Sequence, residues 1–315
     1  MDYAALIVTF NRKEKLVKAL KSLLTQSVAP KKIVLVDNAS TDGTYDYLVE
    51  QRILPSEIVD YHRLEENMGG AGGFEKAFIE VQKLSVDWVS IADDDGIYEP
   101  GYFAAMANAV AKHPGVGAFV STVMLPDGRV DTTHRFTVDD WKMLRWTKVP
   151  LERYNEELDV DVFTFVGALI SMPVIKQVGL PEAGFFIWFD DLDYAVRTRK
   201  VTRILHVPAA KIVHDTDIVA LDSKQVYTPD WREYYGRRNA YYTVLKDGES
   251  WLKYPFLGYK FVKSYIRPLH PRFKGYRYYE YSAATAALKD FLAGRKGVNP
   301  KFKPGSSKNV KPGRF

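Results

Sequence analysis

The stretch WVSIADDDGIYEP, residues 88–100, joins a short apolar run to three consecutive carboxylates. Trp88–Ala92 has the composition of a buried β-strand, and Asp93, Asp94 and Asp95 follow it directly. Carboxylates held side by side raise one another's pKa, so the cluster lowers stability unless a positive charge lies next to it. The sequence therefore predicts a counter-charge at the end of this strand. The alternative is a solvated acidic turn that caps the next helix.

Short β-branched runs and amphipathic runs alternate on both sides of this stretch, which is typical of an open α/β sheet covered by helices. The predicted strands are Ala4–Phe10, Lys32–Val36, Glu57–His62, Trp88–Ala92 and Val116–Thr122. The predicted helices are Lys13–Leu24, Thr44–Glu50, Ala71–Leu84 and Gly101–Lys112. Ligands of such sheets bind beyond the carboxyl ends of the strands. Thr9–Arg12 and Asp37–Ser40 are expected there together with the Asp triplet.

The alternation weakens after residue 123. We predict a hairpin turn at Pro126–Gly128, a buried strand over Val160–Ile170, and a strand pair, Arg203–His206 and Lys211–His214, that turns at Pro208. From Trp231 the chain becomes aromatic and basic with helical runs, and its last residues have too few apolar groups to fold. We therefore expect a main domain over residues 1–230 with halves 1–122 and 123–230, a helical region over 231–294, and a flexible basic tail over 295–315.

The net charge of +5 conceals an uneven distribution. Residues 251–315 carry fifteen Lys and Arg against two acids, which is +13, and residues 1–250 are therefore −8. A basic end of this kind is attracted to a polyanion, either a membrane surface or a nucleic acid. The chain has no cysteine, which excludes disulfides and thiolate metal sites and fits a cytosolic protein. We expect no secretion signal and no membrane-spanning helix.

Two further features carry candidate chemistry. In FFIWFDDLDYAVRTR, residues 185–199, acids open a predicted helix, where the helix dipole favours them and where one of them could serve as a general base. His214 ends a predicted strand and could complete, with Asp95, a site for Mn²⁺ or Mg²⁺. The alternatives are simple helix capping and a structural histidine. The glycine-rich stretch Asn67–Phe74 matches neither nucleotide-loop fingerprint, but it permits close backbone approach.

Five motifs, in their order and spacing, resemble those of the inverting GT-A glycosyltransferases of family two: Thr9–Arg12, Val36–Thr44, Asn67–Gly70, Asp93–Asp95 and Asp190–Tyr194. The likeness covers about residues 1–245. Gly69–Phe74, the Asp triplet and Trp188–Asp191 followed by His214 are most similar to the bacterial galactofuranosyltransferases. Tyr234–Asn239 is also similar to a helix of related rhamnosyltransferases, so the donor sugar stays open.

The resemblance implies a GT-A mixed sheet flanked by helices, with a nucleotide-binding half over about 1–122 and an acceptor-binding half over about 123–230. It implies that Asp191 is the catalytic base and that Asp95 and His214 hold Mn²⁺ or Mg²⁺. The residues implied in nucleotide-sugar binding are Thr9, Phe10, Asn11, Arg12, Asp37, Asn38, Asn67, Gly69, Gly70, Asp93 and Asp94. Those implied in acceptor binding are Trp188, Asp190 and Gly167.

The function that follows from the resemblance is inverting, metal-dependent transfer of a sugar, galactofuranose from UDP-galactofuranose, to a hydroxyl of a lipid-linked cell-surface glycan. Transfer from dTDP-rhamnose is the alternative. Such a bacterial enzyme would be cytoplasmic and peripheral on the inner face of the plasma membrane, with its basic C-terminal region on the anionic lipid. A non-catalytic binder of nucleotide sugars or polyanions is an alternative of another class. No nucleic-acid partner is expected, because the acidic body repels phosphate.

Overall fold

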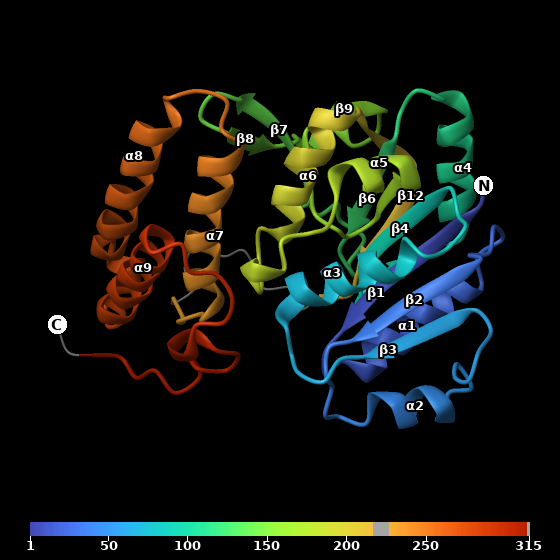
Figure 1. Ribbon diagram of the computed structural model, residues 1–315, viewed down its shortest axis with the longest axis horizontal. Coiled ribbons are helices and arrows are strands. Elements are labelled where there is room, and N and C mark those ends of the chain that lie inside the picture. Colours follow the sequence, from blue (N-terminus) through green and yellow to red (C-terminus); the bar gives the residue numbers. More distant parts are fainter. Residues whose placement is uncertain (217–226, 314–315) are drawn as a thin grey trace. The chain divides into compact units, whose positions relative to one another are not determined.

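The computed structural model describes residues 1–216 and 227–313, and the chain divides into two compact units. The first unit comprises Met1–Val138, Trp146–Ala183 and Asp191–Ile218. The second comprises Asp139–Arg145, Gly184–Asp190 and Val219–Phe315. Figure 1 labels the helices and strands of both units.

The first unit is built on a mixed sheet that has nine strands in the described part of the chain. Their order is β3-β2-β1-β4-β11-β6-β12-β5, and β9 pairs with β12. Strands β1 to β4 are parallel to their neighbours in this group, whereas β11 runs antiparallel to β4 and β6. Their bounds are β1 Tyr3–Thr9, β2 Lys32–Asp37, β3 Val59–Arg63, β4 Trp88–Asp93, β5 Gly96–Tyr98, β6 Ala118–Met124, β9 Leu158–Val160, β11 Ala168–Ser171 and β12 Ile204–His214. A small sheet is formed by β10 (Val162–Phe163), β7 (Arg135–Asp140) and β8 (Arg145–Lys148).

Helices cover both faces of the large sheet, because its strands carry apolar side chains on both faces. Tyr3, Ala5 and Ile7 of β1 belong to a core that includes buried residues of α1 and α4, whereas Val8 meets α3 on the opposite face. The helices are α1 Lys13–Leu24, α2 Thr44–Glu50, α3 Gly69–Val81, α4 Tyr102–Lys112, α5 Met172–Val178 and α6 Asp190–Val201, with 3₁₀ turns at Leu151–Arg153 and Ala183–Phe185. The expected α/β architecture is confirmed, and α1 and α2 have the predicted bounds.

Two strand predictions are wrong. Val160–Ile170 is not one strand, because Gly167 (φ 74°) breaks it between β10 and β11. The predicted pair at Arg203–His214 is instead the single strand β12, whose register against β6 shifts between Val207 and Lys211. Pro208 has no amide hydrogen for the ladder, and a bulge accommodates it without reversing the chain. The hairpin turn at Pro126–Gly128 is confirmed by the bond from the Leu125 amide to the Arg129 carbonyl, 2.7 Å.

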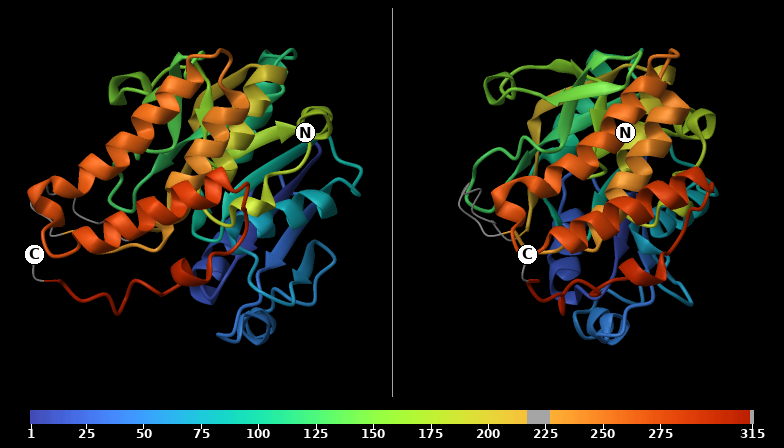
Figure 2. Two further views of the ribbon diagram at one scale, coloured as in Figure 1. Left: turned by 60° about the vertical axis from the view of Figure 1, so that its left-hand side comes forward. Right: turned by 90° about the vertical axis from the view of Figure 1, so that its left-hand side faces the viewer.

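The second unit contains three mutually packed helices, α7 (Arg232–Asp247), α8 (Lys253–Ile266) and α9 (Arg277–Leu292). Figure 2 shows them in orange to red in two further views. Aromatic side chains hold them together, since the ring of Tyr241 lies 4.8 Å from that of Phe261 and 5.5 Å from that of Phe291. Short 3₁₀ turns follow at Arg267–Leu269, Pro271–Phe273 and Pro300–Phe302.

The basic segment after α9 has a buried anchor that its composition does not predict. Phe302 is 1% exposed and stacks on Tyr234 with ring centroids 4.8 Å apart.

Across the described residues, every helix is too short or too polar to cross a membrane.

Candidate active site

The carboxyl ends of three adjacent parallel strands bring the polar motifs together. Thr9 of β1 is in register with Asp37 of β2, and Val8 with Asp93 of β4. Asn11, in the left-handed region at φ 55°, donates its amide to Ser40 Oγ (3.0 Å), and its Oδ1 accepts from the Thr41 amide (2.7 Å). Residues from three separate motifs therefore lie at one edge of the sheet, as expected for a ligand site of an α/β fold.

The counter-charge predicted beside the Asp triplet is present in Arg12. Its Nη1 lies 3.2 Å from Asp94 Oδ1 and 3.0 Å from Asp95 Oδ2, and Thr9 Oγ1 donates to Asp94 Oδ2 (2.7 Å). Burial raises the pKa of Asp94 to about 6 in spite of Arg12, and burial together with Asp95 raises that of Asp93 to about 7. Burial also acts to raise the pKa of Asp95, but His214 and Arg12 outweigh it and hold the value below its ordinary range.

Asp95 and His214 meet because β5 pairs with the end of β12. His214 is in register with Gly96, the Asp215 amide donates to the Asp95 carbonyl (2.8 Å), and His214 Nε2 lies 3.4 Å from Asp95 Oδ1. Asp95 Oδ1 and His214 Nδ1 are buried without a hydrogen-bond partner. Burial lowers the pKa of His214, but the charge of Asp95 raises it by more. Two buried ligand atoms without a hydrogen-bond partner, one on the buried Asp95 and one on the half-buried His214, fit a bound cation.

Two residues that the sequence did not single out extend this group. Ligand atoms of Asp131, His134 and His214 all lie within 4.8 Å of one another. His134 Nε2 is 3.1 Å from Asp131 Oδ2, and its Nδ1 is 2.6 Å from Thr164 Oγ1. Burial lowers the pKa of His134 to about 4, which keeps the imidazole in the neutral form that binds metals. Carboxylate oxygens with imidazole nitrogens are a donor set compatible with Mn²⁺, so the residues present fit the expected cofactor.

Asp37 and Asn38 hold the backbone at the carboxyl end of β2 and at the start of α3. Asp37 is 1% exposed and accepts from the Ser40 amide (2.8 Å) and the Tyr61 hydroxyl. Asn38 Nδ2 donates to the Gly69 carbonyl (2.8 Å) and to Asn67 Oδ1 (3.1 Å), which fixes the start of α3. Phe10 is half-buried at the end of β1, and the space beside the Gly70 Cα is open.

The start of α6 contains carboxylates in different surroundings. Asp191 Oδ1 accepts from the Leu192 amide (2.7 Å), and burial raises the pKa of Asp191 to about 6. Its charge contributes to the raised pKa of Asp93, so the two carboxylates lie close enough to interact. Asp193 Oδ2 instead pairs with Arg197 Nε at 2.9 Å, as a spacing of four residues in a helix allows.

The three residues implied in acceptor binding are not brought together in one unit. Gly167 belongs to the first unit and is explained by packing, because a Cβ there would lie 2.1 Å from Ser121 Oγ. Trp188 and Asp190 belong to the second unit. Trp188 is 40% exposed, whereas Asp190 is buried.

The profile of "Glycosyl transferase family 2" matches residues 4–178, more than half of the chain. The galactofuranosyltransferase GlfT1 of Mycobacterium tuberculosis is 29% identical over 194 residues, which are 60% of this chain and 62% of GlfT1. An N-acetylglucosaminyl-diphospho-decaprenol L-rhamnosyltransferase of the same species is 24% identical over 234 residues, covering 66% of this chain and 74% of that enzyme. The matched region thus spans less than two thirds of the length of GlfT1.

A crystal structure of GalNAc-T7 with UDP, GalNAc and Mn²⁺ superposes with a TM-score of 0.56 at 17% identity, over 86% of this chain and 58% of that one. This likeness confirms the GT-A fold that the motifs predicted. The chain has the fold and motif order of a glycosyltransferase, and the profile match covers the strands that carry the Asp triplet. The chain therefore belongs to glycosyl transferase family 2.

Proposed function

We propose that this glycosyltransferase moves galactofuranose from UDP-galactofuranose to a hydroxyl of a lipid-linked cell-surface glycan, with inversion at the anomeric carbon. The observation that carries the proposal is the pair Asp95 and His214, 3.4 Å apart with orphaned ligand atoms, at the strand ends where the donor motifs converge. The choice of sugar is supported by the likeness to GlfT1 and by the Asp triplet.

Asp95 and His214 would hold the divalent cation, Mn²⁺ or Mg²⁺, with Asp131 and His134 as further candidate ligands. When bound, such a cation neutralises negative charge that develops on the departing diphosphate. Arg12 favours the ionised form of Asp95, which is the form that binds a metal. Asp93 and Asp94 would face the ribose and the diphosphate.

Asp191 would act as the general base. It would take the proton of the acceptor hydroxyl as the oxygen attacks the anomeric carbon from the face opposite the diphosphate. The new carbon–oxygen bond forms while the bond to the phosphate oxygen breaks, so the configuration inverts in one displacement. Asp37, with Thr9, Phe10, Asn11 and Arg12, would contact the base and ribose of the nucleotide. A carboxylate offers about four acceptor positions, so the two bonds that Asp37 already accepts leave room for a ligand.

A location on the inner face of the plasma membrane is part of this proposal. The charge of +13 over residues 251–315 favours anionic lipid. Four aromatic residues of this region, Trp251, Phe256, Tyr259 and Phe261, are candidates for contact with the lipid, and of these Trp251 is 72% and Tyr259 54% exposed. Phe256 is half-buried and Phe261 packs on Tyr241, so the second pair would contribute little.

Transfer from dTDP-rhamnose is the second candidate, because a relative of similar coverage is a rhamnosyltransferase. Thermal-shift measurements separate the two. We expect UDP-galactofuranose with Mn²⁺ to raise the melting temperature more than dTDP-rhamnose, since a ligand that binds only the folded state stabilises it in proportion to the logarithm of its concentration over Kd.

His214→Ala should abolish the increment that depends on Mn²⁺. His113→Ala is the matched control, because His113 pairs with Glu157 on the surface. A larger rise in melting temperature with dTDP-rhamnose would favour the rhamnosyl donor over galactofuranose. Indifference to every nucleotide sugar would contradict both candidates.

A further inference from the structure

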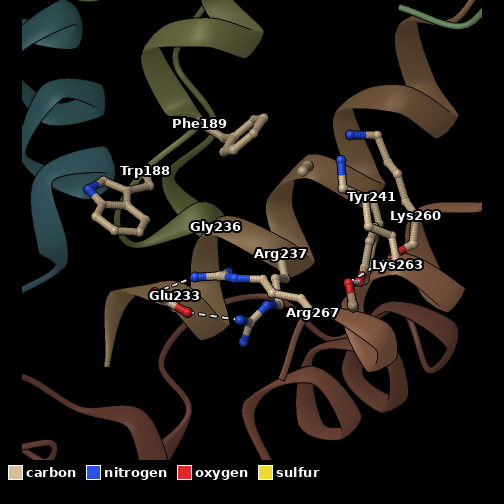
Figure 3. Close-up of a pocket in the computed structure, with 11 residues that line it drawn as sticks. Trp188, Phe189, Glu233, Gly236, Arg237, Tyr241, Lys260, Lys263 and Arg267 are labelled. Atoms are coloured by element: carbon tan, nitrogen blue, oxygen red, sulfur yellow. Dashed lines mark hydrogen bonds and ion pairs between the residues drawn. The ribbon is translucent and has the colours of Figure 1, made fainter. Parts of the chain in front are cut away.

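The second unit contains a cavity of about 410 Å³, a volume in the usual range for small-ligand sites. Figure 3 shows Trp188 and Phe189 on one side of it and Lys260 and Lys263 of α8 on the opposite side. Its remaining walls come from α7 and from Arg267. Every lining residue belongs to the second unit, whereas the candidate metal ligands belong to the first.

The charges around the cavity are predominantly positive. Arg237, Lys260, Lys263 and Arg267 line it against one acid, Glu233. Glu233 accepts from Arg237 Nη2 (2.8 Å) and from Arg267 Nη2 (2.9 Å), as Figure 3 shows. Glu280, which is fully buried, also accepts from Arg237 Nη2 (2.6 Å). Even with both glutamates ionised, the four cations leave a net charge of +2.

Three cationic groups remain available to an anion. Arg237 is 9% exposed, and its Nη1 has no hydrogen-bond partner although it is buried. Neither Lys260 nor Lys263 forms an ion pair with any described residue. Their amino groups lie over rings instead, 5.0 Å from the centroid of Phe256 and 5.7 Å from that of Tyr259. A buried guanidinium nitrogen without an acceptor is costly to leave unsatisfied, so it points to a ligand.

The aromatic side of the cavity is held by hydrogen bonds from α7. Asn239 Nδ2 donates to the carbonyls of Phe185 (3.0 Å), Ile187 (3.1 Å) and Trp188 (2.8 Å). Trp188 and Phe189 both have left-handed backbone, at φ 62° and 74°, an unfavourable conformation that such residues keep only where the surroundings enforce it. A Cβ on Gly236 would lie 2.9 Å from the Trp188 ring, so the glycine permits this contact.

We propose that this cavity binds the diphosphate group of a prenyl-diphosphate-linked acceptor through Arg237, Lys260 and Lys263, with Trp188 and Phe189 beside the group it carries. Its role as an acceptor site rests on the proposed transferase function. A diphosphate that bridges a lipid and a sugar carries one negative charge on each phosphate, which matches the net charge of the cavity. Phe189 also precedes the proposed base, Asp191, by two positions in the chain.

Calorimetric titration of the full chain with farnesyl diphosphate tests the proposal. Lys260→Gln with Lys263→Gln should weaken binding by at least about ten-fold, since a charge-assisted hydrogen bond contributes that much or more. Lys303→Gln with Lys308→Gln removes the same charge from exposed positions outside the cavity and should leave the affinity unchanged. Lys263→Glu alone, at an exposed position that tolerates substitution, should weaken binding as well.

Three results would overturn the proposal. The first is an unchanged affinity in both cavity variants. The second is inorganic pyrophosphate binding as tightly as farnesyl diphosphate, which would make the cavity a site for free phosphates. The third is loss of binding to phosphatidylglycerol vesicles in the cavity variants while farnesyl diphosphate still binds, which would identify a lipid headgroup. UDP binding is measured on the same proteins as a control. If UDP does not bind the wild-type chain, the transferase function is contradicted, but the binding of a diphosphate in the cavity is not. If the Lys260→Gln, Lys263→Gln variant still binds UDP, the result supports two separate ligand sites.

Discussion

At the scale of single residues, Asp191 and Asp193 lie in the same turn of α6 but have different surroundings, which give the two carboxylates different properties. Asp193 is fully buried and pairs with Arg197 at 2.9 Å, an ion pair within α6. Asp191 accepts from the Leu192 amide, and its burial raises the pKa to about 6. A carboxylate whose pKa approaches the working pH accepts a proton more readily than one held in an ion pair. These surroundings support Asp191 as the proposed base.

We expect Asp191→Asn to lower the transfer rate ~10²–10⁴-fold, the usual contribution of a general base. Wild-type activity should rise with pH through about 6, because only the ionised form accepts a proton. The pKa in the folded chain lies above the ordinary 3.8, so ionisation of Asp191 lowers stability as the pH rises between these two values. Asn removes that cost, and the melting temperature of the variant near neutral pH should equal or exceed that of the wild type. pH–rate profiles and thermal melts measure the two effects.

Asp193→Asn is the matched control in the same turn. It breaks a buried ion pair and should lower the melting temperature, by ~2–4 °C for each kcal/mol lost in a domain of this size. A transfer rate for Asp191→Asn close to that of the wild type would remove Asp191 from the role of base.

The sequence identified the residues of the site that follow strands better than those in irregular segments. Asp95 and His214 could be paired in advance because each ends a recognisable apolar run. Asp131 and His134 could not, because they lie between a turn and a short strand where no periodicity marks them; an Asp-x-x-His spacing after the hairpin turn was the only signal. The family resemblance implied a role for Arg12 in nucleotide binding, but its contacts with Asp94 and Asp95 could not be predicted, because they span more than eighty positions.

At the scale of elements, the site depends on two features that alternation of apolar residues does not encode. The bulge in β12 keeps the strand running past Pro208, so that His214 reaches β5 and Asp95. The close contact between α3 and β1 depends on Gly73, since a Cβ there would lie 2.4 Å from Val8 Cγ1. Periodicity predicts that a helix exists after Asn67, but the distance at which it packs is set by individual glycines.

Gly73→Ala and Gly70→Ala form a matched pair within α3. We expect Gly73→Ala to lower the free energy of unfolding by about 1–3 kcal/mol, because the added Cβ would overlap Val8 Cγ1 and overpack the contact between α3 and β1. Gly70 has open space around it, so Gly70→Ala should leave the free energy unchanged or raise it by up to about 1 kcal/mol. Urea unfolding measures both. Val8→Ala combined with Gly73→Ala should recover part of the loss, and equal effects of the two single substitutions would refute the packing argument.

At the scale of the whole molecule, charge and apolar exposure coincide in the C-terminal part of the chain. Residues 251–315 carry the net +13, whereas residues 1–250 carry −8. Along α8 and its flanks, Trp251 is 72% exposed, Val262 58%, Ile266 58% and Leu269 57%. Apolar side chains recurring at helical spacing beside basic residues are the pattern of a helix that lies in a membrane interface. The sequence predicted this attraction from charge, but the exposed aliphatic residues Val262, Ile266 and Leu269 could be identified only from the structure.

Binding to phosphatidylglycerol vesicles should therefore depend on the basic charge and on the exposed apolar side chains of this region. Sedimentation of the full chain with vesicles measures both contributions. Raising the salt concentration should release the protein, because screening weakens attraction between the basic residues and the lipid. Val262→Glu with Ile266→Glu should weaken binding at constant salt, since two exposed apolar side chains are lost and two negative charges added. Val49→Glu with Ile79→Glu makes the same change at exposed positions of α2 and α3 and should have a much smaller effect. Equal losses in the two double variants would show that net charge alone drives adsorption and that α8 does not enter the interface.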